Sequence, residues 1–206
     1  SAASDVYKRQ EMRDVSFSYD DGGWAVQDVS IELPAGQTVA LVGASGAGKT
    51  TVAALLAGLR VPEEGKVLVD GVEVSALSDT ERVARLAMVT QEVHVFSGTL
   101  RADLSLAAPQ ANDEQMLQAL ERVGARWYAQ LEQGLDTVIG SQGIQLDPVA
   151  SQQLALARIL LLDPKLVIMD EATAEAGSVG AEALEQAAAE VTRCLLYTSD
   201  AADDSL

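Results

Sequence analysis

The sequence contains very little cysteine and comparatively little positive charge. Cys194 is its only cysteine, which excludes a framework of disulfide bonds. Lysine and arginine together number 14 against 31 aspartates and glutamates, and the formal net charge is −17. Because nucleic-acid binding needs clustered basic side chains that neutralise phosphates, this balance argues against nucleic acid as a main partner.

Long apolar segments are also missing from the sequence. No apolar run is long enough to span a bilayer, and residues 1–10 contain no apolar core of the kind found in a secretory signal. We therefore expect this piece of chain to be soluble and to act on the cytoplasmic side of a membrane. Its 206 residues are 48% apolar and 22% charged, which is typical of one globular domain with a real core.

The two ends of the chain share an unusual relation at the DNA level. Residues 1–10 (SAASDVYKRQ) match the translation of TCGGCAGCGTCAGATGTGTATAAGAGACAG. The complementary strand of that segment, shifted by one base, encodes CLLYTSDAA from Cys194 onward. Two ends encoded by opposite strands of one segment resemble a sequencing adaptor read through as coding sequence. We therefore expect 1–10 and 194–206 to be adaptor-derived, the natural fragment to be about 11–193, and both natural ends to be missing.

Hydrophobic periodicity predicts a mixed α/β domain. Residues 12–19 and 24–33 alternate as two strands around the turn at Asp20–Gly23. Asn112 is a good helix cap, and Asp163-Pro164 ends a helix. Further strands are expected at 38–42, 67–69, 87–89 and 166–169, and helices at 49–59, 112–123, 149–162 and 180–191.

A complete phosphate-binding motif occupies Gly43–Thr50. The segment reads GASGAGKT, follows the apolar strand 38–42 and opens a helix, which is the context that G-x-x-x-x-G-K-[ST] requires. Glycines allow backbone N–H groups to turn toward phosphate oxygens, and the helix N-terminus adds its dipole. Lys49 should reach the β- and γ-phosphates of ATP, and Thr50 should ligate Mg²⁺. The residues expected to contact nucleotide here are Gly43, Ser45, Gly46, Ala47, Gly48, Lys49, Thr50 and Thr51.

A second motif lies at Lys165–Glu171, which reads KLVIMDE. Four apolar residues followed by two carboxylates resemble a Walker B strand. Asp170 would then hold Mg²⁺ through water, and Glu171 would polarise the attacking water as the catalytic carboxylate.

These motifs, in this order, resemble the nucleotide-binding domain of ABC transporters, and more closely the exporter type. The resemblance implies that Tyr19, in FSY, stacks on adenine, and that Gln91 touches Mg²⁺, takes part in catalysis and faces a transmembrane coupling helix. Residues 95–100 resemble the exporter continuation, and Thr137–Gly143 the cross-talk loop. The implied fold is an α/β P-loop NTPase with a mostly parallel core sheet, an N-terminal antiparallel β subdomain and a helical subdomain at about 92–160.

Three departures from the family pattern stand out. The signature LSGGQ is replaced by LDPVA at Leu146–Ala150, where Pro148 cannot donate a backbone hydrogen bond and Asp147 adds negative charge. The D-loop reads AEAG at Ala174–Gly177. No switch histidine follows it, since His94 is the only histidine and is predicted to lie on the surface. The region that would hold the H-loop is expected to be missing by truncation.

The resemblance implies an ATPase that binds ATP and Mg²⁺ and powers a membrane exporter. Such domains close head to tail in pairs, each site using the P-loop of one chain and the signature of the other. An intact P-loop beside a degenerate signature therefore predicts one half of an asymmetric heterodimer, with a transmembrane domain on the same full-length chain at the cytoplasmic face of the cell membrane.

Two alternatives stay open at this point. An importer ATPase with separately encoded membrane subunits is disfavoured by the exporter-like stretch 96–99. A regulatory cassette that binds ATP without hydrolysing it is favoured by the signature and disfavoured by Glu171. The transported substrate contacts the membrane domain, so this sequence does not identify it.

Overall fold

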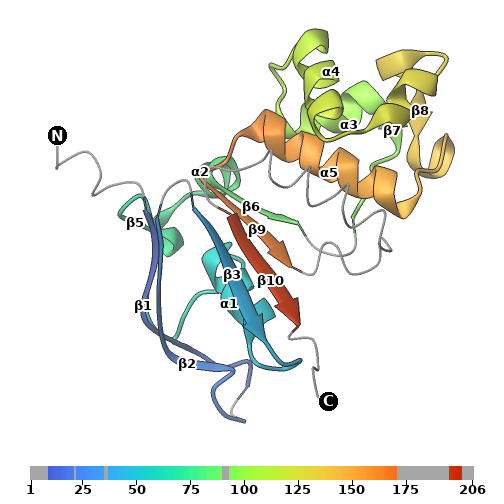
Figure 1. Cartoon of the computed structure of the whole chain (residues 1–206). Helices are drawn as coiled ribbons and strands as arrows, with labels where there is room; N and C mark the ends of the chain where they lie inside the picture. The colour runs from blue at the N-terminus through green and yellow to red at the C-terminus, as the bar shows by residue number, and fades with distance from the viewer. Residues whose placement is uncertain (1–8, 21, 35–36, 90–92, 171–194, 201–206) are drawn as a thin grey trace. The chain divides into compact units, whose positions relative to one another are not determined.

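A computed structural model of the chain describes residues 9–20, 22–34, 37–89, 93–170 and 195–200 (Figure 1). The chain divides into two compact units. The first comprises Ser1–Met88, Pro164–Glu171 and Thr192–Leu206, and the second comprises Val89–Asp163 and Ala172–Val191. The helix expected at 180–191 and the D-loop at 174–177 lie outside the described residues.

An antiparallel sheet forms the N-terminal part of the first unit. Its strand order is β2-β1-β4-β5, and β1 pairs antiparallel with both neighbours. The expected antiparallel β subdomain is thereby confirmed, although the second strand begins at Val26, two residues after Trp24. The bounds are β1 (Arg9–Phe17), β2 (Val26–Pro34), β4 (Glu64–Val69) and β5 (Val72–Glu73).

The second sheet of this unit has the order β3-β10-β9-β6, and β10 runs parallel to both β3 and β9. This confirms the mostly parallel core sheet. Helix α1 (Lys49–Leu56) packs against β3, β9 and β10, as Figure 1 shows. The strands are β3 (Thr38–Gly43), β6 (Leu86–Val89), β9 (Leu166–Asp170) and β10 (Leu195–Asp200).

Strand β10 lies in the tail that sequence analysis excluded from the fold. Leu195 stands opposite Thr38 of β3 and Val167 of β9, so β10 fills the position between these two strands. Tyr and Thr within its LLYTSD sequence favour extended backbone. Pairing also supplies hydrogen-bond partners to the backbone groups that β3 and β9 turn toward each other. The DNA origin of this tail stays a prediction, but the segment takes part in the sheet.

The core of the first unit lies between the sheets and α1. Its side chains come from both sheets and from the inner face of the helix, and each fully buried leucine contributes about 1.5–3 kcal/mol. This burial fixes α1, and with it the loop that precedes the helix. The core includes Met12, Val15, Leu33, Leu55, Leu56, Val67, Val69, Leu166 and Ile168.

Helix α1 ends earlier than its sequence pattern predicts. The apolar pattern extends to Leu59, but the helix stops at Leu56 because Gly58 adopts a φ of 69°. A Cβ atom on Gly58 would lie 2.5 Å from Val74 Cγ1, so only glycine fits this turn. The chain then folds back, and the N–H groups of Leu59 and Arg60 both donate to the Ala54 carbonyl.

The second unit is built mainly from helices. Helix α5 packs against α3 and α4, and a two-stranded pair, β7 with β8, lies in the same unit. Asn112 caps α4 as predicted, in a capping box with Gln115, whereas Leu117 of that helix stays partly exposed. The bounds are β7 (Gly98–Thr99), α3 (Leu100–Ala107), α4 (Asp113–Arg122), β8 (Val138–Ile139) and α5 (Pro148–Leu162).

Helices α2 and α3 and the shortest elements were not predicted from the sequence. Helix α2 has no buried residue and is stabilised by a capping box between Ser78 and Glu81, so apolar periodicity could not reveal it. The remaining elements are α2 (Asp79–Arg85) and the 3-10 helices η1 (Val74–Ala76), η2 (Arg126–Gln130), η3 (Gly134–Asp136) and η4 (Gly140–Gln142).

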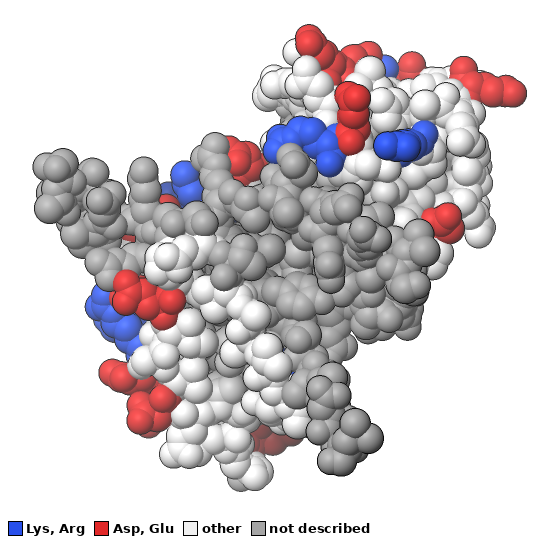
Figure 2. All heavy atoms as spheres, in the orientation of Figure 1, with Lys and Arg blue, Asp and Glu red and all other residues white. Residues whose placement is uncertain are grey.

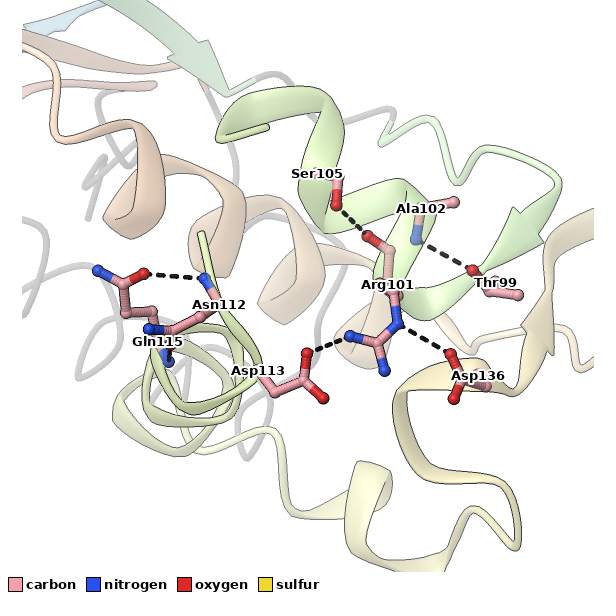
Figure 3. A network of polar contacts seen from close by, with 8 residues as sticks. All are labelled: Thr99, Arg101, Ala102, Ser105, Asn112, Asp113, Gln115 and Asp136. Atoms are coloured by element: carbon pink, nitrogen blue, oxygen red, sulfur yellow. Dashed lines mark hydrogen bonds and ion pairs between the residues drawn. The ribbon is translucent and has the colours of Figure 1, made fainter. Parts of the chain in front are cut away.

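Arg101 connects three segments of the second unit (Figure 3). Its Nε donates to Asp136 Oδ1 at 2.8 Å, and its Nη1 pairs with the Asp113 carboxylate at the start of α4. The bond from Arg101 lowers the pKa of Asp136, and both carboxylates raise the pKa of Arg101. The two carboxylates are exposed and Arg101 is partly exposed, so the network sets geometry more than stability.

The described surface has mixed charge, and the described helices are short or polar. On the face drawn in Figure 2, the described Lys and Arg side chains lie in small groups close to Asp and Glu side chains. Among the described helices, none combines the length and the apolar character needed to cross a bilayer.

Candidate nucleotide-binding site

The phosphate-binding motif forms a tight loop between β3 and α1. Gly46 and Gly48 adopt φ values of 81° and 86°, which disfavour any residue with a side chain. A Cβ atom on Gly48 would also lie 2.9 Å from the Ala25 carbonyl oxygen. Gly48 is the N-cap of α1 and makes no side-chain cap hydrogen bond, so the first-turn N–H groups of α1 can serve an anion.

Lys49 lies across this loop and is largely buried. Its Nζ donates to the carbonyl oxygens of Gly43 at 2.7 Å and Ala44 at 3.0 Å. These two bonds hold the ammonium group at the mouth of the loop, next to the amides of the motif. A positive charge and a set of amide donors are thereby directed to the same place, as phosphate binding requires.

A hollow of about 260 Å³ opens beside the loop. It brings together all the residues expected to contact nucleotide except Gly43 and Ala47, and it adds Ala25, which sequence analysis missed. Nothing in the sequence marks Ala25, since its place depends on how β2 begins beside Gly48. The lining residues are Tyr19, Ala25, Ser45, Gly46, Gly48, Lys49, Thr50 and Thr51.

Tyr19 presents an aromatic ring at the edge of this hollow. It follows the end of β1 and is 52% exposed. Its hydroxyl lies 3.1 Å from Thr51 Oγ1, and the Phe17 ring meets it edge-on at 5.1 Å between centroids. The tyrosine is therefore fixed to the first turn of α1 while much of its ring stays accessible, which suits stacking by a base.

The residues expected to hold Mg²⁺ and to act in catalysis are described only in part. Thr50 lies exposed in the first turn of α1, on the hollow. Asp170 is the last residue of β9, in the sheet whose strand β3 leads into the loop. Gln91, Glu171 and the Asp170 side chain lie outside the description. Over the described residues, no cluster of three or more His, Cys, Asp and Glu could hold a metal alone.

The donor set nonetheless fits Mg²⁺ bound together with nucleotide. Magnesium takes a few protein oxygens plus phosphate oxygens and water rather than a protein cage. Thr50 offers a hydroxyl oxygen beside a loop that is shaped for phosphate. Strand β9, which ends at Asp170, and strand β3, which leads into the loop, both run parallel to β10. Asp170 and the loop therefore lie at the same carboxyl end of the sheet.

The segment expected to be a degenerate signature, LDPVA, lies at the start of α5 in the second unit. Asp147 is the N-cap, and its Oδ1 accepts from the Ala150 N–H at 2.7 Å. Pro148 is the first helical residue, a position that proline favours. This helix end is therefore closed by a carboxylate from its own chain.

A buried carboxylate that sequence analysis missed lies in α3. Asp103 Oδ2 accepts from the Phe96 N–H at 3.0 Å, and Oδ1 lies 3.5 Å from Arg158 Nε of α5. Burial raises the pKa of Asp103, while Arg158 and the Phe96 N–H act to lower it. Arg158 also donates to the carbonyl oxygen of His94, whose side chain is exposed as predicted. The sequence signal was an acidic residue between Leu100 and Leu104 on one helical face.

The segment expected to be the cross-talk loop is held by β7. Strand β8 within it pairs antiparallel with β7, and Ser141 Oγ lies 2.5 Å from Ser97 Oγ. A Cβ atom on Gly140 would lie 3.0 Å from the Phe96 carbonyl oxygen, so glycine allows this approach. The loop and the stretch 96–99 thus form one local structure.

Comparison with known proteins places these features in a family. The family model described as ABC transporter matches residues 26–174. The ATP-dependent lipid A-core flippase of Alcanivorax borkumensis is 34% identical over 193 residues, covering 93% of this chain and 33% of the flippase. The mycobactin import ATP-binding/permease protein IrtB of Mycobacterium tuberculosis is 41% identical over 171 residues, covering 82% of this chain and 29% of IrtB.

A solved structure of a bacterial Atm1-family ABC exporter with ATP bound also matches. Its TM-score is 0.81 at 29% identity, and the match covers 93% of this chain and 34% of the exporter chain. The chain therefore spans about a third of the length of the curated relatives it matches.

Proposed function

The chain belongs to the ABC transporter family, and we propose that it is the ATP-binding and ATP-hydrolysing domain of a membrane exporter. The observation that carries the proposal is the hollow beside the phosphate loop, where Lys49, Thr50 and Tyr19 meet. It offers a cation, a metal-ligating hydroxyl and an accessible ring. These are the three chemical features that a nucleoside triphosphate with Mg²⁺ requires.

Each residue of the site has a distinct part in this proposal. Backbone amides from Gly43 to Thr51 bind the phosphates, and Lys49 neutralises charge on the β- and γ-phosphates. Thr50, Asp170 and Gln91 hold Mg²⁺, and Tyr19 stacks on adenine. When bound, Mg²⁺-ATP supplies a phosphoryl group that can be transferred to water. Glu171 orients and polarises that water, because catalysis in this class depends mainly on positioning and charge neutralisation.

The site is proposed to be completed by a second domain of the same family. That partner would supply its signature to the phosphates on this chain, while this chain would offer the LDPVA segment in return. Since Asp147 already accepts from the Ala150 N–H, and Pro148 has no N–H, this segment provides few donors to the partner's nucleotide. The asymmetry supports a heterodimer with one efficient and one poor site.

The membrane part is proposed to lie on the same full-length chain, with this domain at the cytoplasmic face. The chain covers only 29% of IrtB, which is named an ATP-binding/permease protein, so that relative joins both functions in one chain. The flippase and the Atm1-family exporter support outward transport. IrtB is named for import, so the opposite direction is the outcome to exclude by transport assays.

A second candidate function is a regulatory cassette that binds ATP without turnover. The closed start of α5 favours it, because the γ-phosphate donors of the family signature are missing there. The two candidates differ in what Glu171 does. In the hydrolytic domain it acts on water, whereas in the regulatory cassette it has no catalytic part.

Substitution of Glu171 separates these candidates in the full-length transporter. Glu171→Gln removes the charge that polarises water, so it should preserve ATP binding and abolish turnover at the site built on this chain's P-loop. Glu64→Gln, at the exposed first residue of β4, is the matched control and should change neither. Unchanged hydrolysis in Glu171→Gln would overturn the catalytic assignment and favour the regulatory cassette.

A further inference from the structure

Arg60 lies against the face of the Tyr19 ring. Its guanidinium carbon is 5.5 Å from the ring centroid, which is within the range of a cation–π interaction. The arginine follows α1 and reaches this place because the Gly58 turn directs the chain back toward Ala54. The chain carries a net charge of −17, yet the described contact of this arginine is with an aromatic ring.

Tyr19 is thereby held on several sides by the first unit. Thr51, in the first turn of α1, fixes its hydroxyl, and Phe17 meets the ring edge-on. Arg60, just beyond the last turn of α1, covers a face of the ring. Tyr19 lines the hollow beside the phosphate loop and is 52% exposed, whereas Arg60 does not line the hollow, so the arginine leaves part of the ring accessible from it.

We propose that Arg60 is a positioning residue for the nucleotide base, acting through Tyr19. This inference rests on the proposed function, because it assigns the free face of Tyr19 to adenine. A cation on one face draws the π electrons of the ring toward itself and makes the opposite face less negative. That opposite face stacks better on an electron-rich purine. Arg60, Tyr19 and adenine then form three successive layers.

The role predicts a specific pattern of ligand affinities. Arg60 acts on the base and makes no contact with phosphate, so its removal should weaken Mg²⁺-ATP and leave inorganic tripolyphosphate unaffected. A purely electrostatic role would weaken both ligands, because both are triphosphate polyanions. A purely structural role would lower thermal stability and weaken both ligands.

Calorimetric titration of the complete chain with Mg²⁺-ATP and with tripolyphosphate tests this pattern. Arg60→Met should weaken ATP binding about 2- to 5-fold, the scale of an exposed cation–π contact, with tripolyphosphate binding and the melting temperature unchanged. Arg60→Lys keeps a cation and should recover part of the loss. Arg13→Met removes the same charge from β1, where Arg13 pairs with Glu11, and is the matched control.

A double-mutant cycle with Tyr19→Leu completes the test. If Arg60 acts through the ring, adding Arg60→Met to Tyr19→Leu should cause no further loss of ATP affinity. An equal loss in both backgrounds, or an equal loss for ATP and tripolyphosphate, would overturn the inference. So would unchanged ATP affinity in Arg60→Met. Failure of the unaltered chain to bind either ligand would overturn the proposed function as well.

Discussion

Helix α1 in the first unit and helix α5 in the second both begin where the family places a loop against phosphate, and they begin in opposite ways. The N-cap of α1 is Gly48, which makes no side-chain cap hydrogen bond. The N-cap of α5 is Asp147, whose carboxylate accepts from the Ala150 N–H, with Pro148 following. The start of α1 is available to an external anion, whereas the start of α5 is already capped by the Asp147 carboxylate of its own chain.

The difference shows that stability and anion binding compete at a helix start. A capping carboxylate stabilises its helix but occupies the donors and the positive end of the dipole. A glycine cap leaves both available, and the helix is then held by burial of its inner face. In α1 the buried residues Val52, Leu55 and Leu56 stabilise the helix by packing into the core. Substitutions at each helix start test this difference between α1 and α5.

The largest effect is expected from reopening α5. In the full-length transporter, Asp147→Ser with Pro148→Gly, Val149→Gly and Ala150→Gln restores the family signature. Donors aimed at a transferring phosphate are worth about 10²–10³ in rate, so the site on the partner's P-loop should accelerate by that order if the partner has its catalytic glutamate. Site-resolved nucleotide trapping, with Walker B inactivated in one chain at a time, measures this rate.

Equal turnover at the two sites before the change would contradict the asymmetry. It would show that LDPVA is a working signature, compatible with a homodimer. The site on this chain's own P-loop serves as the internal control, since the four substitutions leave its residues untouched.

A smaller effect is expected from removing the cation at the open helix start. Lys49→Ala should weaken nucleotide binding by about 1.5–3 kcal/mol, the scale of hydrogen bonds to charged groups. Lys66→Ala is the control, because Lys66 pairs with Glu73 on the antiparallel sheet. Equilibrium binding of ATP to both variants provides the measurement. Equal losses in the two would mean that Lys49 acts only through net charge.

The next effect concerns the stability of the closed helix start. Asp147→Ala removes the cap of α5 and should lower the free energy of unfolding by about 0.5–2 kcal/mol. Asp147→Asn keeps a capping oxygen and should retain most of the stability. Denaturant unfolding of the three proteins tests the pair. If Asn destabilised as much as Ala, the contribution of Asp147 would not be a cap.

The smallest effect concerns the charge pair that holds α5 farther along. Burial raises the pKa of Asp103 above its ordinary value of 3.8, so the folded protein retains this proton over a pH range where the unfolded chain has lost it. The Asp103 contribution to the free energy of unfolding should therefore fall as pH rises from about 4 through the raised pKa. Asp103→Asn has no such titration.

The measurement is the difference in free energy of unfolding between the Asp103→Asn and unaltered proteins across that range. This difference should change with pH in the range of the titration and become flat above it. A difference that is flat throughout would mean that the pKa of Asp103 is the same in the folded and unfolded states.

Local patterns in the sequence predicted the phosphate loop and its helix. The motif at Gly43–Thr50 specifies its own geometry, because the glycines, the strand before it and the helix after it are all neighbours in sequence. The cap at Asn112 was predictable for the same reason. The hairpin and the parallel sheet followed from strand periodicity and from the family resemblance.

Contacts between distant segments could not be predicted in this way. The contact of Arg60 with Tyr19 depends on the Gly58 turn, and the pair of Asp103 with Arg158 depends on how α3 and α5 pack. Asp147 was expected to place charge near phosphate, and its use as a cap emerged only from the structure. Strand β10 was not predicted because its apparent DNA origin excluded 194–206 from the expected fold, although its LLYTSD sequence favours extended backbone.

The place of β10 has a kinetic consequence. Strands β3 and β9 pair with β10 and not with each other, so the central sheet closes only when a segment far along the chain arrives. Pairings of such high contact order carry a large loop-closure entropy and slow folding. Assembly of this sheet should therefore be the late step in folding.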